Sequence, residues 1–143
     1  MSIPLKADVY AEMRFVPDTQ SLASARRFVA KSLSGLPEAP LADLTLAIDE
    51  ALANVIEHAG SPPDASIALK LYRENDHVRV IMTNPGVRFE GDRLAPVDLE
   101  AHAAARRTSG LGVFLMKQLM DLVLFRSTRD GLQELVMVKN LAA

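Results

Sequence analysis

Residues 41–60, LADLTLAIDEALANVIEHAG, constrain the fold of this chain more than any other stretch, because their pattern is that of one long helix with two different faces. At about 100° per residue the apolar side chains form a single stripe, made of Leu44, Ile48, Ala51, Val55 and Ala59. Polar side chains gather within about a third of the circumference elsewhere, namely Asp43, Glu50, Asn54, Glu57 and His58. The helix must therefore pack on a core by one face and present polar groups by the other.

Glu50 and Asn54 are the most informative polar pair of this helix. They stand four residues apart, so one lies above the other and both address the same small volume. A carboxylate can polarise a hydroxyl or a water molecule, and an amide oxygen can ligate a hard cation such as Mg²⁺. A solvated helix face has the same composition, so this stretch alone leaves both interpretations open.

The composition is that of one globular domain covering residues 1–143, with 49% hydrophobic and 24% charged residues. No apolar run has the length of a membrane span, and residues 1–9 lack the apolar centre of a secretory signal, so we expect a soluble, cytoplasmic protein without a membrane partner. The absence of cysteine excludes disulfides and thiolate metal sites. A net charge of −2 argues against direct nucleic-acid binding.

Alternating and helical patterns predict the remaining elements. Residues 7–15 alternate as a strand, and a helix begins at Asp18 or Ser21 and runs to Ser34. Two β-hairpins follow later in the chain, one from residues 66–72 and 78–82 and one from residues 122–128 and 133–140. The order predicts an α/β (α+β) two-layer sandwich, with a mixed, largely antiparallel sheet and helices on one face.

Two irregular segments separate the first hairpin from the next helix. Asn84-Pro85-Gly86 has the composition of a turn, and residues 91–108 mix Gly, Pro, alanines, Arg106 and Arg107 in a way that predicts a mobile connection of lid length. Ser109-Gly110-Leu111-Gly112 then opens a helix. Its small residues let the backbone approach a ligand, and its free amides favour an anion such as phosphate. A plain helix start capped by Thr108 or Ser109 would have the same pattern.

Taken together, these segments resemble the GHKL ATPase superfamily, most closely its small anti-sigma factor serine kinases. Residues 50–58, EALANVIEH, are similar to the family's N-box. Residues 108–121, TSGLGVFLMKQLMD, are similar to its glycine box and the helix that follows. The resemblance covers nearly the whole chain and implies a Bergerat-type ATP-binding fold with ATP and Mg²⁺ as cofactors.

The resemblance also implies a role for each matching residue. Asn54 would ligate the Mg²⁺ that bridges the ATP phosphates, Glu50 would be the general base, and His58 would belong to the same nucleotide site. The phosphates would be surrounded by the glycine box under a closing lid, at Thr108, Ser109, Gly110, Leu111 and Gly112, with Arg106 or Arg107 as phosphate partners. These are the groups that phosphoryl transfer requires, since it depends mostly on positioning and charge neutralisation.

One turn departs from the family pattern. The family usually has an Asp-x-Gly turn whose carboxylate accepts a hydrogen bond from the adenine amino group, and this chain has Asn84 and Gly86 at those places. Asn84 keeps an acceptor oxygen but loses the charge, which typically contributes about 1 kcal/mol to such a bond. Adenine preference is therefore open, and the amide donor makes tolerance of guanine conceivable.

The implied function is that of an ATP-dependent serine/threonine-protein kinase acting as an anti-sigma factor, which binds a sigma factor and phosphorylates an anti-anti-sigma (STAS-type) protein on serine. The alternative is a non-catalytic, nucleotide-responsive binding module with an altered adenine site. The ATPase part of a sensor histidine kinase fits less well, because none of the histidines lies on an upstream phosphoacceptor helix. We also expect a homodimer through residues 7–15, whose strand edge would otherwise be unpaired.

Overall fold

The computed structural model describes residues 9–57, 62–85 and 109–141. Its elements follow the expected order: β1 (Val9–Phe15), α1 (Thr19–Ser32), α2 (Glu38–Glu57), β2 (Ile67–Arg73), β3 (His77–Asn84), α4 (Ser109–Leu119), β4 (Leu122–Ser127) and β5 (Gln133–Asn140). None of the described helices is long and apolar enough to cross a membrane.

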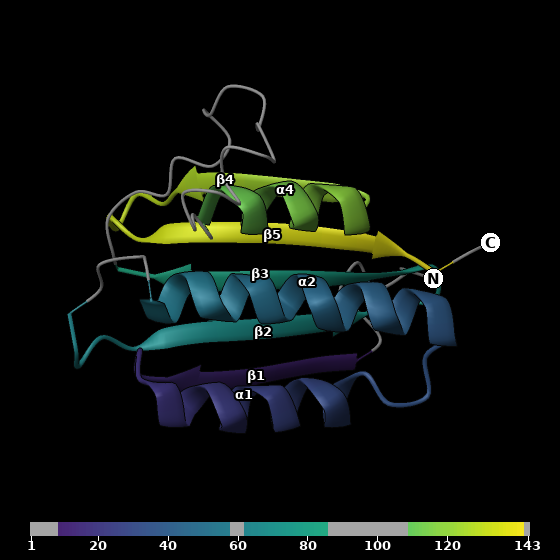
Figure 1. Cartoon of the computed structure of the whole chain (residues 1–143), viewed down its shortest axis with the longest axis horizontal. Coiled ribbons are helices and arrows are strands. Elements are labelled where there is room, and N and C mark those ends of the chain that lie inside the picture. Colours follow the sequence, from purple (N-terminus) through teal and green to yellow (C-terminus); the bar gives the residue numbers. More distant parts are fainter. Residues whose placement is uncertain (1–8, 58–61, 86–108, 142–143) are drawn as a thin grey trace, which may run out of the picture.

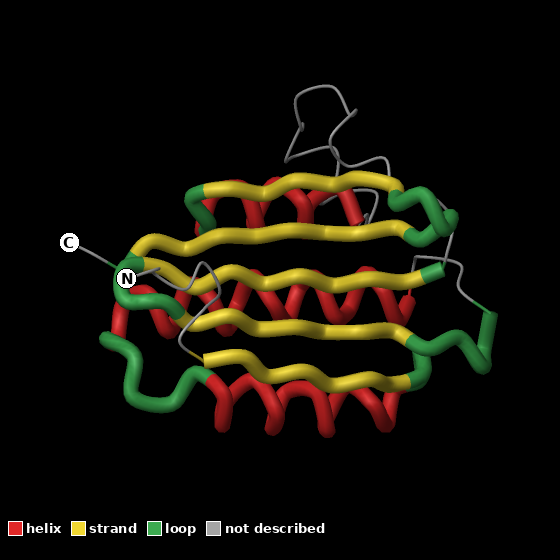
Figure 2. The backbone as a smooth tube through the Cα atoms, turned by 180° about the vertical axis from the view of Figure 1, so that it is seen from behind, coloured by secondary structure: helices red, strands yellow, loops and turns green. Residues whose placement is uncertain are grey.

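The strands form one five-stranded sheet in the order β1-β2-β3-β5-β4. The two predicted hairpins join through β3 and β5, which pair from His77 opposite Asn140 to Asn84 opposite Gln133. All four pairings of the described strands are antiparallel, where a mixed, largely antiparallel sheet was predicted. The described helices lie on one face of this sheet, and Figures 1 and 2 show that they leave the other face open. The predicted two-layer sandwich is thus confirmed.

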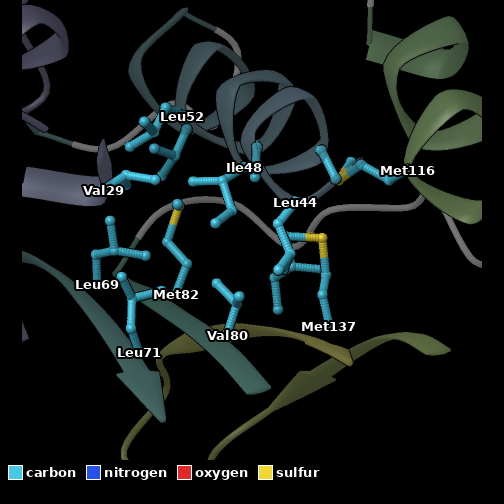
Figure 3. Packing of buried hydrophobic residues seen from close by; sticks show 14 of the residues in the cluster. Val29, Leu44, Ile48, Leu52, Leu69, Leu71, Val80, Met82, Met116 and Met137 are labelled. Carbon is cyan, nitrogen blue, oxygen red and sulfur yellow. The ribbon is translucent and has the colours of Figure 1, made fainter. Parts of the chain in front are cut away.

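Helix α2 lies over the middle of the sheet and supplies the centre of the core (Figure 1). Leu44, Ile48 and Leu52 are at most 1% exposed. They point from α2 toward apolar side chains of the sheet, among them Leu69, Leu71, Val80, Met82 and Met137 (Figure 3). Of the predicted apolar stripe, Leu44, Ile48, Ala51 and Val55 are buried, and Leu52, which was not part of that prediction, widens it. Ala59 lies outside the described residues.

The start of α2 differs from the prediction. The helix begins at Glu38, three residues before the expected Leu41, and it contains Pro40 in its first turn. The first amides of a helix have no intrahelical partner, so proline is tolerated there although it lacks a donor. Leu41 N donates to Pro37 O at 3.0 Å and closes this turn.

Side chains from other elements fix the ends of the helices. Asp18, one of the two predicted starts of this helix, caps α1, with its carboxylate accepting a hydrogen bond from Ser21 N at 2.8 Å. At the other end Arg73 of β2 donates to Ser32 O at 3.2 Å and to Ser34 O at 2.9 Å. Because the last carbonyls of a helix lack intrahelical donors, this arginine ties α1 to the sheet.

Lys139 of β5 binds the end of α4 in the same way. Its Nζ lies 2.7 Å from Leu119 O at the end of α4 and 2.8 Å from Asp43 Oδ2 on α2. One half-buried ammonium group therefore holds α2, α4 and the sheet together.

Candidate functional site

The start of α4 lies directly against the polar face of α2. A Cβ atom placed on Gly112 would be 2.9 Å from Glu50 Oε1 and 3.3 Å from Asn54 Nδ2. Cβ atoms essentially never come within 3.0 Å of a non-bonded heavy atom, so a side chain at position 112 would require the Glu50 carboxylate to move. The structure thus brings together three residues that the sequence places in two separate motifs.

Asn54 is unusual because it is polar, buried and incompletely bonded. Its exposed fraction is 6%, and its Nδ2 has no hydrogen-bond partner among the residues that the structure describes. A buried donor without a partner costs about 1–3 kcal/mol, so such groups are rare in folded proteins. Its NH2 group is therefore free to donate to a ligand, such as a phosphate oxygen, whereas a cation would bind the amide oxygen Oδ1.

Glu50 lies beside Asn54 in a partly desolvated position. Burial raises the pKa of this carboxyl group above its ordinary value of 4.5, and the nearby negative charges of Asp49 and Glu57 raise it further. A carboxylate whose pKa is raised toward neutrality is a better proton acceptor than one exposed to water. The environment of Glu50 is consistent with the predicted role of general base.

The charge next to Glu50 is balanced by a residue that sequence reasoning did not identify. Arg26 of α1 donates two hydrogen bonds to the Asp49 carboxylate, from Nε to Oδ1 at 2.5 Å and from Nη2 to Oδ2 at 3.0 Å. The two residues are 23 positions apart, and no local pattern signals their pairing. A cavity of about 40 Å³ lies beside this pair between α1 and α2, and it is too small for a nucleotide.

Asn84 lies at the end of β3 rather than in a free turn. It pairs with Gln133 of β5 and is 8% exposed, so the departure from the family pattern falls on a buried residue. The next predicted site residue, Gly86, lies outside the described residues.

The remaining predicted site residues divide into two groups. The backbone of Ser109, Gly110 and Leu111 forms the first turn of α4, as expected for a glycine box that opens a helix. His58, Arg106, Arg107 and Thr108 lie outside the described residues, as does the predicted lid at 91–108. The described site therefore consists of Glu50, Asn54 and the N-terminal turn of α4.

This donor set fits a magnesium–nucleotide complex better than a metal held by protein alone. In the described part of the chain, no group of three or more His, Cys, Asp or Glu side chains could hold a metal ion. Mg²⁺ commonly takes only one or two protein ligands and completes its shell with phosphate oxygens and water. The amide oxygen of Asn54 would be one such ligand, and its Nδ2, which has no partner among the described residues, would donate to a phosphate oxygen. The first amides of α4, which lack intrahelical partners as in any helix, offer a place for the phosphates.

A family model described as histidine kinase-like ATPase domain matches residues 15–139, nearly the whole chain. Its match includes α2, the hairpins and the start of α4, and hence every described residue of the site.

Curated relatives and a solved structure agree with this match. The chain is 27% identical over 125 residues to the serine-protein kinase RsbW of Bacillus cereus strain AH187, which covers 85% of this chain and 72% of that protein. It is 28% identical over 110 residues to RsbW of Listeria monocytogenes, covering 73% and 70%. A chain in the crystal structure of the SiaB–SiaC complex from Pseudomonas aeruginosa has the same fold, with a TM-score of 0.56, 15% identity and coverage of 94% of this chain and 91% of that one.

Proposed function

Because the chain belongs to the histidine kinase-like ATPase family, we propose that it is an ATP-dependent protein-serine/threonine kinase that acts as an anti-sigma factor. It would bind a sigma factor and phosphorylate an anti-anti-sigma, STAS-type antagonist on serine. The RsbW proteins to which it is similar are named serine-protein kinases, and this supports the reaction type.

The observation that carries the proposal is the meeting of Glu50, Asn54 and Gly112. Glu50 and Asn54 of α2 lie so close to Gly112 of α4 that no side chain fits between the two helices without a shift. Asn54 is also buried, and its Nδ2 donor has no partner among the described residues. A purely structural contact between two helices would be filled by apolar side chains, as it is elsewhere in this core.

Each side chain of the site has a task in phosphoryl transfer. When bound, Mg·ATP supplies the phosphoryl group and neutralises its negative charge. Asn54 would bind the cation through its amide, and the amides at the start of α4 would hold the phosphates. Glu50 would accept the proton of the acceptor serine, for which its raised pKa and its position beside Asn54 suit it.

A second candidate follows from Asn84. A buried amide where relatives of the resembled branch carry a carboxylate weakens the expected bond to adenine. The protein would then be a nucleotide-responsive binding module that sequesters its partner without catalysis.

Phosphoryl transfer from radiolabelled ATP to candidate serine-bearing antagonists distinguishes the two functions. A kinase predicts labelled antagonist with the wild type and about 10²- to 10⁴-fold slower labelling with Glu50→Gln, the range expected for loss of a general base. Glu38→Gln, at an exposed acid in the first turn of the same helix, is the matched control and should label normally. Mg·ATP binding without any transfer by the wild type would instead establish the module.

A further inference from the structure

The open face of the sheet carries an apolar patch on its β3-β5-β4 side. Strand register places Ile81, Val136 and Leu124 in one row and Val138 and Leu122 in the next. The alternate residues of these strands face the helices in the core, so the row residues face away from them. We call these five residues the open-face patch.

Exposure within the open-face patch is greatest on the edge strand β4 and least at Val136, which is 6% exposed. Leu122 is 48% and Leu124 is 40% exposed, and Figure 2 shows that none of the described helices covers this face. Scattered apolar residues on a surface need no explanation, but apolar side chains that gather on an uncovered face mark a binding surface.

Basic side chains border this patch. In the same rows Arg79 lies beside Val138, and Lys70 lies beside Ile81. A third row of this face has Arg14 at one end and Arg126 at the other. Arg14 forms an ion pair with Glu12 at 3.0 Å, and Arg126 forms one with Glu134 at 2.6 Å, so these two arginines are already neutralised. The face therefore has an excess of positive charge, contributed by Lys70 and Arg79, on a chain whose net charge is −2.

The guanidinium group of Arg79 packs on an aromatic ring. Its Cζ lies 4.6 Å from the centre of the Tyr72 ring, and that ring packs on Tyr10 with 4.9 Å between the ring centres. Its Nε is shielded from solvent and has no hydrogen-bond partner. Within the described residues the guanidinium thus has an aromatic support but no counter-charge.

The charge and the shape of this face select the kind of partner. A second copy placed on it by a two-fold axis would bring like charges together, whereas an acidic surface would be attracted. A helix is about 10 Å wide and spans the two strand spacings of the patch, just as the protein's own helices cover the opposite face. We propose that the open-face patch docks an amphipathic helix of a partner protein, with its apolar stripe on the patch and acidic residues against Lys70 and Arg79.

Two synthetic helical peptides of about 18 residues test this proposal. Both carry the same leucine stripe, and the residues that flank it are glutamates in one and lysines in the other. Fluorescence anisotropy with the full chain should detect binding of the acidic peptide and at least about tenfold weaker binding of the basic one. The affinity for the acidic peptide should fall as salt rises.

Variants locate the binding. Leu124→Ser should weaken acidic-peptide binding about tenfold or more, and Arg79→Gln should weaken it several-fold. Leu46→Ser is the control for the first, since Leu46 of α2 is 43% exposed on the opposite layer, and Arg27→Gln on α1 is the control for the second. Both controls should bind the acidic peptide like the wild type, and thermal unfolding should show that all four variants are folded.

Three results would overturn the proposal. The first is equal affinity for the two peptides, and the second is an affinity for the acidic peptide that is absent or unaffected by Leu124→Ser. The third is light scattering in which Leu124→Ser halves the particle mass, because the face would then belong to a second copy of this chain.

Discussion

At the scale of the residue, Glu50 and Asn54 are placed at some cost to the folded protein. The Glu50 carboxyl group is partly buried beside other negative charges, and Asn54 keeps a buried donor unpaired. Groups in such positions destabilise a fold unless a ligand satisfies them. Both costs are understandable if the site is completed by a cation and an anionic ligand.

Glu50→Gln should therefore stabilise the nucleotide-free protein at neutral pH. The folded pKa is raised, so the ionised carboxylate destabilises the fold above that pKa, and the penalty vanishes as the pH falls through it and the group protonates. We expect a melting temperature about 1–4 °C above wild type at pH 7.5 and a difference that shrinks toward pH 4.5. Glu38→Gln should show no such gain, and a lower melting temperature for Glu50→Gln at pH 7.5 would contradict this reading of the site.

Gly112→Ala should separate folding from function. Alanine favours a helix by about 1 kcal/mol relative to glycine, but its Cβ would lie 2.9 Å from Glu50 Oε1, and the flexible carboxylate would have to move. We expect a stability within about 1 kcal/mol of wild type and a phosphoryl-transfer rate lowered about 10- to 100-fold, measured by denaturation and by transfer assays. Gln118→Ala, at an exposed position of the same helix, is the control. Normal transfer by Gly112→Ala would show that the close contact is unimportant.

At the scale of the element, α2 and α4 pack side by side in the core, and two polar contacts lie along their interface. One is the contact of Gly112 with Glu50 and Asn54, and the other is Lys139, which binds Asp43 on α2 and Leu119 O on α4. Lys139 of β5 thus links the two helices that carry the site without touching Glu50, Asn54 or Gly112.

Lys139→Met should destabilise the protein by about 1–3 kcal/mol, because it removes an ion pair and a helix-end hydrogen bond while keeping most of the side-chain volume. Urea denaturation should measure this difference. Lys117→Met, at an exposed position of α4, should change stability by less than about 0.5 kcal/mol. Equal losses in the two variants would mean that Lys139 acts only as a surface charge.

Most elements could be predicted from the sequence because their signals are local. The alternation of Ile67, Leu69 and Leu71 and the Asp130-Gly131 turn each depend on neighbours in the chain, and the corresponding elements are present. The early start of α2 was missed because Pro40 usually indicates a helix break, although the first turn tolerates it.

The site could be predicted only in part, for the same reason. Spacing along α2 placed Glu50 beside Asn54, but nothing local showed that Gly112 would lie against both. Nor did any pattern link Arg26 to Asp49, or show that Asn84 would be buried in a strand. Contacts between distant segments depend on how α1, α2 and α4 pack side by side, and helical periodicity does not determine that packing.

At the scale of the whole molecule, the two faces of the sheet have different roles. The described helices cover one face and leave the other open (Figures 1 and 2). The helical layer contains the candidate site, and the open face contains an apolar patch with basic neighbours. The edge of the sheet at β1 is a third feature, since β1 pairs only with β2 among the described strands.

An unpaired strand edge exposes backbone donors and acceptors, and pairing with a second copy would satisfy them. We therefore predict a homodimer through β1, with a mass near twice 15.6 kDa by light scattering at micromolar concentration. This dimer leaves the open-face patch free, so Leu124→Ser should keep the dimer mass. A particle of 15.6 kDa for the wild type would refute the prediction.

The central claim is that Mg·ATP binds between α2 and the start of α4 through Asn54, and calorimetry of Mg·ATP binding tests it most directly. Asn54→Ala removes the cation ligand but breaks no hydrogen bond of Nδ2, so the variant should fold. Asn75→Ala, in the exposed turn between β2 and β3, is the matched control. We predict wild-type affinity for Asn75→Ala and an affinity weakened at least about tenfold for Asn54→Ala. Unchanged Mg·ATP affinity in folded Asn54→Ala would contradict the account.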